Sequence, residues 1–384
     1  MRLSVLTAAF VAALVGLASA LAVVLAAAAA VGATQAQTTS WVTGLALAMA
    51  ASSLILSAWH RIPVITAWST PGAAVIAATA GVTINAAVGA FLFAGTLIIL
   101  TAMITPLGRL IERIPVAVAS AMLAGVLVRF VTAMFEGISL SPELVLPLIA
   151  LFLILRVWSP SSAMLGVVAA AIGIAIWSGA FAGGWPTLEL STITLIEPAF
   201  DPALLIGLGV PLYLVTMASQ NLPGAAVLRA AGYPVPMASC LAVTGLASII
   251  TAPIGAHTVN LAAITAAICT GPDAHPDPAK RWLAGVVYGF IYAGVAACGA
   301  SIVALFAAFP AILIKAIAGL GLIGSLTGAL GQALHDETTR FAAVLTFAVT
   351  ASGITLLGVG AAFWGLAAGL ITLGLDKWVG AIRS

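Results

Sequence analysis

Long runs without a charged side chain constrain this chain more than any other feature. No Asp, Glu, Lys or Arg occurs in residues 3–60, 62–108, 157–188, 230–272 and 282–314. A helix that crosses a bilayer needs about 20 apolar residues, so several of these runs can hold two spans each. Because 63% of the residues are hydrophobic and only 6% are charged, a soluble globular domain is excluded and a polytopic membrane protein is predicted.

The hydrophobic pattern divides the chain into fourteen membrane elements. The first continues from Leu3 to Gly32, beyond the roughly 7–15 apolar residues of a secretory signal, so we interpret it as a span. The predicted elements are 4–32, 38–59, 63–81, 83–105, 113–136, 142–158, 161–181, 202–219, 235–251, 253–271, 282–308, 311–333, 338–356 and 358–377.

The basic residues predict an orientation in the cell (inner) membrane, because Lys and Arg concentrate on the cytoplasmic side. With both termini cytoplasmic, eleven of the thirteen basic residues lie on that side: Arg2, Arg61, Arg109, Arg113, Arg156, Arg229, Lys280, Arg281, Arg340, Lys377 and Arg383. The two others, Arg129 and Lys315, are expected inside or at the outer end of spans, extending toward the outer surface.

Two apolar segments, residues 63–81 and 253–271, look like one broken helix used twice. At an offset of 189 residues, four alanines of the first segment coincide with four alanines of the second. Each segment begins with an extended stretch containing Pro or Gly and continues as a short Ala-rich helix. We therefore predict a short strand plus a half-helix in both. Matched interrupted segments in two halves indicate the binding site of a transporter.

A second internal match supports a repeat. Residues 110–115 and 305–310 both lead through a proline into an Ala-rich helix, at an offset of 195. Two matches at similar offsets imply two halves, and seven elements in each half would place the second half upside down. The predicted fold is an all-α polytopic membrane protein with fourteen transmembrane segments in a 7+7 inverted repeat.

Polar residues near the breaks are the candidate substrate-binding residues. Helix N-termini attract anions, and the predicted spans contain no Asp or Glu except close to their ends, at Glu136, Glu143 and Asp376, so a small anion is favoured. For the Ser, Thr and Asn residues the alternative is helix capping, and for residues 219–221 it is a helix end at the membrane surface. The candidates are Trp68, Ser69, Thr70, Gly72, Ser219, Gln220, Asn221, His257, Thr258 and Asn260.

His257 is also the candidate proton-coupling residue. It is the one histidine predicted inside a span, and histidine gains and loses a proton near neutral pH. A protonated His257 would attract a carboxylate, and a bound carboxylate would favour the proton in return. The alternative is a neutral histidine that is hydrogen-bonded to backbone within the break.

Two stretches, Ser219–Tyr233 and Thr251–His275, strongly resemble the bacterial benzoate/proton symporter family, and the resemblance covers essentially the whole chain. It implies the fourteen-segment fold shared with uracil/proton symporters and sulfate or bicarbonate transporters. In that fold, residues 1–105 and 202–308 would form a core domain, and residues 106–181 and 309–384 a gate domain. Uracil symporters bind substrate with glutamates on elements 8 and 10. Neutral residues or histidine stand in those neighbourhoods here, which favours a carboxylate.

The functional hypothesis is a proton-coupled symporter that imports benzoate or a closely related aromatic carboxylate by alternating access. The alternatives are a transporter of another small anion or a nucleobase, or an anion channel. An enzyme is not expected, because HExxH, GxSxG and paired intramembrane Asp are absent. We expect no cofactor, metal or nucleic acid, since the three cysteines lack metal-like spacing. The partners are substrate, protons and the lipid bilayer, and a homodimer is left open.

Overall fold

The computed structural model describes residues 2–104, 115–158, 163–179, 181, 185, 187–357 and 359–383, the last four of these by backbone alone. Arg109, Arg113 and most of the repeat at residues 110–115 lie outside the described residues.

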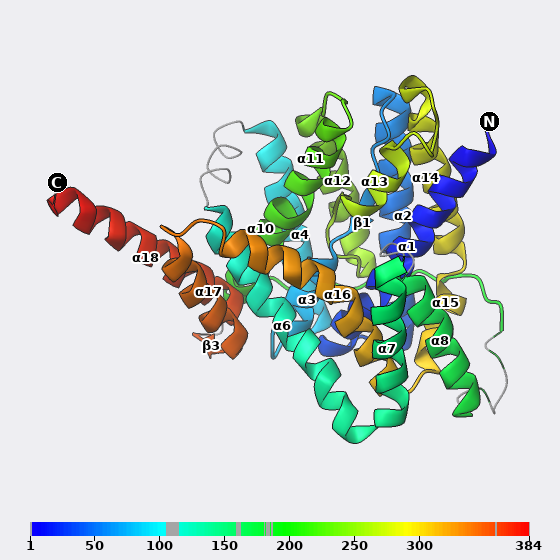
Figure 1. Ribbon diagram of the computed structural model, residues 1–384, viewed down its shortest axis with the longest axis horizontal. Coiled ribbons are helices and arrows are strands. Elements are labelled where there is room, and N and C mark those ends of the chain that lie inside the picture. The colour runs from blue at the N-terminus through cyan, green and yellow to red at the C-terminus, as the bar shows by residue number, and fades with distance from the viewer. Residues whose placement is uncertain are drawn as a thin grey trace.

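The described chain is mostly helical (Figure 1). The elements are α1 (Leu3–Ala30), α2 (Gln35–His60), β1 (Thr66–Trp68), α3 (Thr70–Ala78), α4 (Ile84–Met103), α6 (Val116–Leu140), α7 (Pro142–Trp158), α8 (Ala163–Trp177), α9 (Pro202–Leu204), α10 (Val210–Thr216), α11 (Leu222–Ala230), α12 (Met237–Thr251), β2 (Val259–Leu261), α13 (Ile264–Thr270), α14 (Trp282–Ala297), α15 (Gly299–Ala307), α16 (Ala311–Ala333), α17 (Arg340–Ser352), β3 (Thr355–Leu356), β4 (Val359–Gly360) and α18 (Ala361–Arg383).

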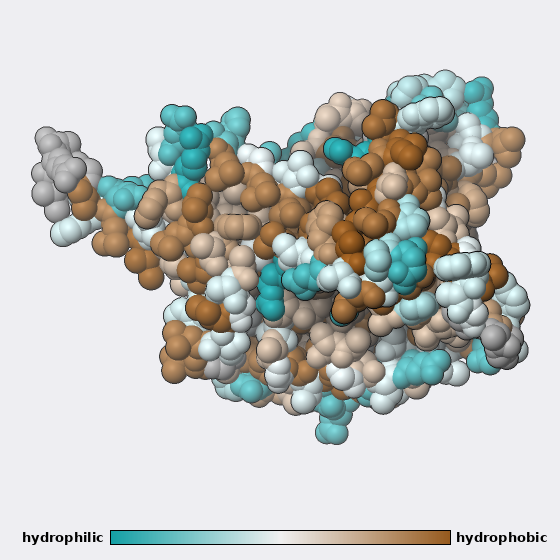
Figure 2. Space-filling model, turned by 60° about the horizontal axis from the view of Figure 1, so that its bottom comes forward, coloured by the Kyte–Doolittle hydropathy of each residue, from teal (hydrophilic) through white to brown (hydrophobic). Residues whose placement is uncertain are grey.

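Several helices are suited to a bilayer by length and composition. Within the part of the chain that is described, seven helical stretches are long and apolar enough to cross a membrane. The pair α14 and α15, bent by 62° at Cys298, would make an eighth, and α8 and α17 are shorter apolar helices. Hydrophobic side chains cover much of the face in Figure 2, and many large ones are exposed. Such a surface is expected to face lipid.

The two segments around residues 63–81 and 253–271 each contain a strand followed by a short helix. In the first, β1 precedes α3, and in the second, β2 precedes α13. The strands pair antiparallel, with Thr66 opposite Leu261 and Trp68 opposite Val259. Segments almost 200 residues apart therefore meet at one two-stranded ribbon in the middle of the fold (Figure 1).

The stretch around Pro223 differs from the prediction. We expected a helix end near residue 219, but the helical path continues from Pro202 to Ala230. A π-helical turn, Leu205–Gly209, precedes Pro211, and another, Met217–Asn221, precedes Pro223. Proline has no N–H and clashes with the carbonyl one turn earlier, and a widened turn relieves that conflict without ending the helix. The predicted end of this element at residue 219 is therefore wrong.

Small residues let the helices around the ribbon approach closely. At Gly285 in α14, a Cβ atom would collide with the Ser57 side chain of α2, and at Gly321 in α16 it would collide with the Ser19 carbonyl of α1. Close backbone approach at small residues is the usual basis of helix packing in membranes. Helix α1 also contacts α3, α13 and α14, so it lies against both strand-and-helix segments as well as α16.

Candidate functional site

The ribbon of β1 and β2 has its backbone groups satisfied by neighbouring side chains. The Thr66 N–H donates to Ser53 Oγ at 3.0 Å, and the Val259 N–H donates to Ser248 Oγ at 3.0 Å. Asn221 Oδ1 accepts from the Leu261 N–H at 2.9 Å. Non-helical backbone at membrane depth is tolerated only when protein or a cavity satisfies it. Serines from α2 and α12 and Asn221 of the π-helical turn supply these partners.

The start of α3 is tied to the second broken segment. Ser69 Oγ accepts from the Gly72 N–H at 3.1 Å and from the Thr216 hydroxyl at 3.2 Å. The Ser69 N–H donates to the Thr258 carbonyl at 3.0 Å. The hydroxyls of Thr216 and Thr258 are 2.8 Å apart. Ser69 and Thr258 therefore join the two segments as well as capping α3.

His257 is fully buried and held through both ring nitrogens. The indole N–H of Trp41 donates to Nδ1 at 3.0 Å, and Nε2 is 3.0 Å from the Ser69 carbonyl oxygen. The indole can only donate and the carbonyl can only accept, so the proton lies on Nε2. This arrangement requires neutral imidazole, because a proton on Nδ1 would face the Trp41 N–H.

A cavity of about 180 Å³, which we call the strand cavity, lies where β1, α3 and α13 meet α1, the second π-helical turn, α14 and α16. No described residue on its wall is charged. Its polar lining residues are Ser19, Thr70, Ser219, Gln220, Thr265, Tyr288, Tyr292 and Ser325.

Two hydroxyls on this wall make no hydrogen bond of good geometry with a described residue, although they lie close to each other. They belong to Tyr288 in α14 and Thr265 in the first turn of α13, and both oxygen atoms are buried. A buried polar group without a well-formed hydrogen bond costs about 1–3 kcal/mol, so a ligand that bonded these two hydroxyls would recover that cost. The residue before α13, Ala263, also provides no side-chain cap, which leaves backbone N–H groups at the cavity.

Aromatic rings form another part of the wall. Tyr288 and Tyr292 lie one helical turn apart, with ring centroids separated by 4.7 Å, and Trp68 meets Tyr292 edge-on at 6.0 Å. Across from them, a Cβ on Gly16 of α1 would lie 3.0 Å from the Tyr292 hydroxyl. The glycine therefore lets the α1 backbone approach the Tyr292 hydroxyl closely. Rings and unpaired hydroxyls together suit a flat ligand with a polar end.

The ten predicted site residues divide into two groups. Trp68, Thr70, Ser219 and Gln220 line the strand cavity. The other six do not line it and lie buried behind the wall, where hydrogen bonds or packing hold the two segments together: Ser69, Gly72, Asn221, His257, Thr258 and Asn260.

Sequence reasoning did not find Thr265, Tyr288 and Tyr292. A signal was present, because the chain has only four tyrosines and two of them are spaced i, i+4 within the charge-free run 282–314. That spacing places both phenols on one helix face. What the sequence does not show is that this face of α14 packs toward the ribbon.

An arginine also meets the far end of each short helix. Arg281 Nη1 donates to the carbonyl of Thr270, the last residue of α13, at 2.8 Å. Arg129 Nη1 lies 3.4 Å from the carbonyl of Ala78, the last residue of α3. Cations at helix C-termini satisfy the free carbonyls and complement the helix dipole. Arg129 comes from α6, so it also connects α6 to the first broken segment.

Comparison with known proteins agrees with a transport function. The family model described as BenE, benzoate membrane transport protein, matches residues 1–375. Inner membrane protein YdcO of Escherichia coli (strain K12) is 43% identical over 365 residues, covering 95% of this chain and 93% of that protein. The benzoate membrane transport protein of Acinetobacter baylyi (strain ATCC 33305 / BD413 / ADP1) is 33% identical over 333 residues, covering 86% and 84%.

Solved structures show the same fold at low sequence identity. The transmembrane domain of the cyanobacterium bicarbonate transporter BicA aligns with a TM-score of 0.61 at 14% identity, covering 96% of this chain and 97% of that one. SLC26A9 aligns with a TM-score of 0.64 at 13% identity, covering 95% of this chain and 64% of that one.

Many apolar helices around a strand-paired break, together with a match to a family of membrane transport proteins over residues 1–375, define a multi-span membrane transporter and not an enzyme. The chain belongs to the benzoate membrane transport protein family. The predicted family membership is thereby confirmed.

Proposed function

We propose that the protein is a proton-coupled symporter that imports benzoate or a closely related aromatic carboxylate. The observation that carries the proposal is the strand cavity, with three aromatic rings, two unpartnered hydroxyls and no charged side chain on its described wall. A carboxylate would receive hydrogen bonds from Tyr288 and Thr265, while its ring would pack against Trp68 and the tyrosines. A similarity to a relative named as a benzoate transport protein supports this choice of substrate.

We further propose alternating access between two domains built as an inverted repeat of fourteen segments. Residues 1–105 and 202–308 would form the core, and residues 106–181 and 309–384 the gate. In support, the two strand-and-helix segments pair antiparallel, and the strand cavity has core residues on most sides and Gly321 and Ser325 of the gate helix α16 on another. A substrate in this cavity would be released when the core moves against α16.

The orientation belongs to the same proposal. Both termini would be cytoplasmic in the inner membrane, which places most basic residues on the cytoplasmic side. A relative named as an inner membrane protein, at 43% identity, supports this location.

His257 is the proposed site of proton coupling. Protonation of Nδ1 would convert an acceptor into a donor that faces the Trp41 N–H, so proton binding would break the contact between α2 and the second broken segment. A proton taken up there would therefore change how these segments pack, and an anion in the neighbouring cavity would favour that proton.

The test is uptake of labelled benzoate into proteoliposomes that contain the purified protein, with an imposed inward proton gradient. Accumulation above equilibrium that disappears with the gradient supports the proposal. Ring-substituted benzoates should compete and uracil should not, because uracil brings no carboxylate to the hydroxyls. Displacement by uracil at a comparable concentration would instead favour a nucleobase carrier. A steady anion current without a proton gradient would favour a channel.

A further inference from the structure

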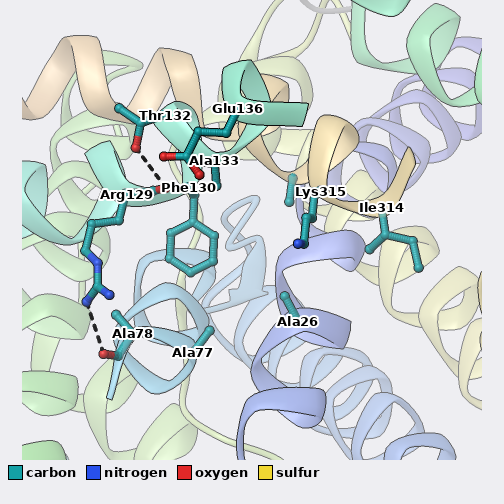
Figure 3. Close-up of a pocket in the computed structure, with 11 residues that line it drawn as sticks. Ala26, Ala77, Ala78, Arg129, Phe130, Thr132, Ala133, Glu136, Ile314 and Lys315 are labelled. Atoms are coloured by element: carbon teal, nitrogen blue, oxygen red, sulfur yellow. Dashed lines mark hydrogen bonds between the residues drawn. The ribbon is translucent and has the colours of Figure 1, made fainter. Parts of the chain in front are cut away.

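A second cavity of about 440 Å³ lies along the same helices as the strand cavity, farther toward the C-terminal end of α1 (Figure 3). We call it the Lys315 cavity. Helix α1 contributes Ala20 to the strand cavity and Ala26 to the Lys315 cavity, which are about 9 Å apart along the helix at 1.5 Å per residue. Gly321 of α16 packs against the Ser19 carbonyl at the strand cavity, and both residues line that cavity.

The charges on this wall are unusual for this chain. Arg129 and Lys315 are the two basic residues that the proposed topology does not place on the cytoplasmic side, and both line this one cavity. Glu136 is the one acidic residue on the described wall, and its carboxylate makes no ion pair with any described residue. The lining therefore carries a net charge of +1.

The two cations have different surroundings. Arg129 is directed to the Ala78 carbonyl at the end of α3. Lys315 makes no ion pair and no hydrogen bond with any residue that the structure describes. Its ammonium is therefore the group that is available to an anion from solution.

The rest of the wall is apolar and includes one aromatic ring. In Figure 3 the Phe130 ring lies between Arg129 and Lys315, above Ala77 and Ala78 of α3. The Lys315 ammonium, the Phe130 ring and the alanine side chains of α3 together match a ligand with one carboxylate and one aromatic ring. The volume also falls within the range of about 300–1,000 Å³ that small-molecule pockets occupy.

We propose that the Lys315 cavity is a capture site for aromatic monocarboxylates, which pair with the Lys315 ammonium and pack on Phe130 before they reach the strand cavity. The proposal rests on the proposed function, since it names a second site for the same substrate, farther toward the C-terminal end of α1 than the strand cavity. A fixed cation at an entrance raises the local concentration of an anion, and the effect falls with ionic strength.

Kinetics in intact cells that express the full chain provide the first test. Lys315→Gln is expected to raise KM for benzoate about fivefold at low salt with little change in maximal rate, which equals about 1 kcal/mol, the upper range for an exposed ion pair. The difference should shrink as salt is added. Lys315→Arg should retain a low KM, and Lys377→Gln, which removes an exposed lysine of α18, is the matched control. An unchanged KM in Lys315→Gln at low salt overturns the proposal.

Thiol protection provides the second test and separates this proposal from the proposed function. With Cys298→Ser as background, Lys315→Cys should react with a membrane-impermeant thiol reagent from outside, and benzoate should slow the reaction while acetate should not. The same protection is expected when Tyr288→Phe is added, which weakens the strand cavity alone. If benzoate fails to protect, or if the reagent does not reach the thiol, the capture site is refuted even when the wild-type protein accumulates benzoate.

Discussion

Replacing Tyr288 with Phe should affect binding and stability in opposite directions. The substitution keeps the ring in place and removes only a hydroxyl that is buried and makes no hydrogen bond of good geometry with a described residue. Leaving such a group unsatisfied costs about 1–3 kcal/mol, so the empty protein should be as stable as wild type or more stable by up to that amount.

Affinity should fall in the same variant. A hydrogen bond to a charged group contributes about 1.5–3 kcal/mol, and at 1.4 kcal/mol per decade its loss weakens benzoate binding roughly 10- to 100-fold. Equilibrium binding of labelled benzoate to the detergent-solubilised protein measures the loss of affinity. Thermal unfolding of the same sample without ligand measures the change in stability.

Tyr213→Phe is the matched control. The Tyr213 hydroxyl is hydrogen-bonded to the Thr101 hydroxyl, and Tyr213 does not line the strand cavity. Its removal should lower stability by about 1 kcal/mol and leave benzoate affinity within twofold of wild type. The reasoning fails if Tyr288→Phe binds benzoate as tightly as wild type, or if the two variants lose affinity equally.

Three further outcomes are expected. The glutamine in His257→Gln can keep both hydrogen bonds, to Trp41 and to the Ser69 carbonyl, but it cannot titrate. Benzoate exchange should therefore persist, while the pH dependence of transport and the accumulation of benzoate are lost. If the variant accumulates benzoate as the wild type does, the proton binds to another group. Gly321→Ala should lower the free energy of unfolding by about 1–3 kcal/mol, because the new Cβ meets the backbone of α1. Gly324→Ala, on the same helix but in open space, should be neutral or stabilising. Equal melting temperatures for the two variants would contradict the predicted difference. Thr265→Val should weaken benzoate binding about as much as Tyr288→Phe does, and unchanged affinity would remove Thr265 from the site.

The sequence allowed the membrane class, the family and the two interrupted segments to be predicted, because each depends on local pattern. Charge-free runs require burial in lipid whatever the helices pack against. Pro, Gly and cap-type residues before an Ala-rich run end one helix and start another in any context. For the same reason, four predicted residues close to the breaks, Trp68, Thr70, Ser219 and Gln220, do line the strand cavity.

Local pattern does not determine those features that depend on the neighbours of a segment in the fold. The sequence predicted a helix end at residue 219, before Pro223. In the structure a π-helical turn accommodates Pro223, and the helix continues from Pro202 to Ala230. His257, Thr258 and Asn260 looked like ligand contacts because they are polar residues in an apolar run. In the structure these three residues do not line the strand cavity and are buried, with hydrogen bonds to Trp41, Thr216 and the β2 backbone, which a broken backbone at membrane depth needs.

Only the tertiary structure decided which side chains surround the cavity. Tyr288 and Thr265 belong to different helices, and nothing in their local sequence shows that their hydroxyls reach one space without a partner. The same holds for Arg129 and Lys315, which lie 186 residues apart and would each be read as a surface cation. The sequence by itself determined that the chain crosses a membrane with two broken helices, because hydrophobicity and backbone preference act over a few residues. The packing of α1, α14 and α16 around the ribbon decided where a ligand fits, because a cavity is defined by contacts between residues far apart in the chain.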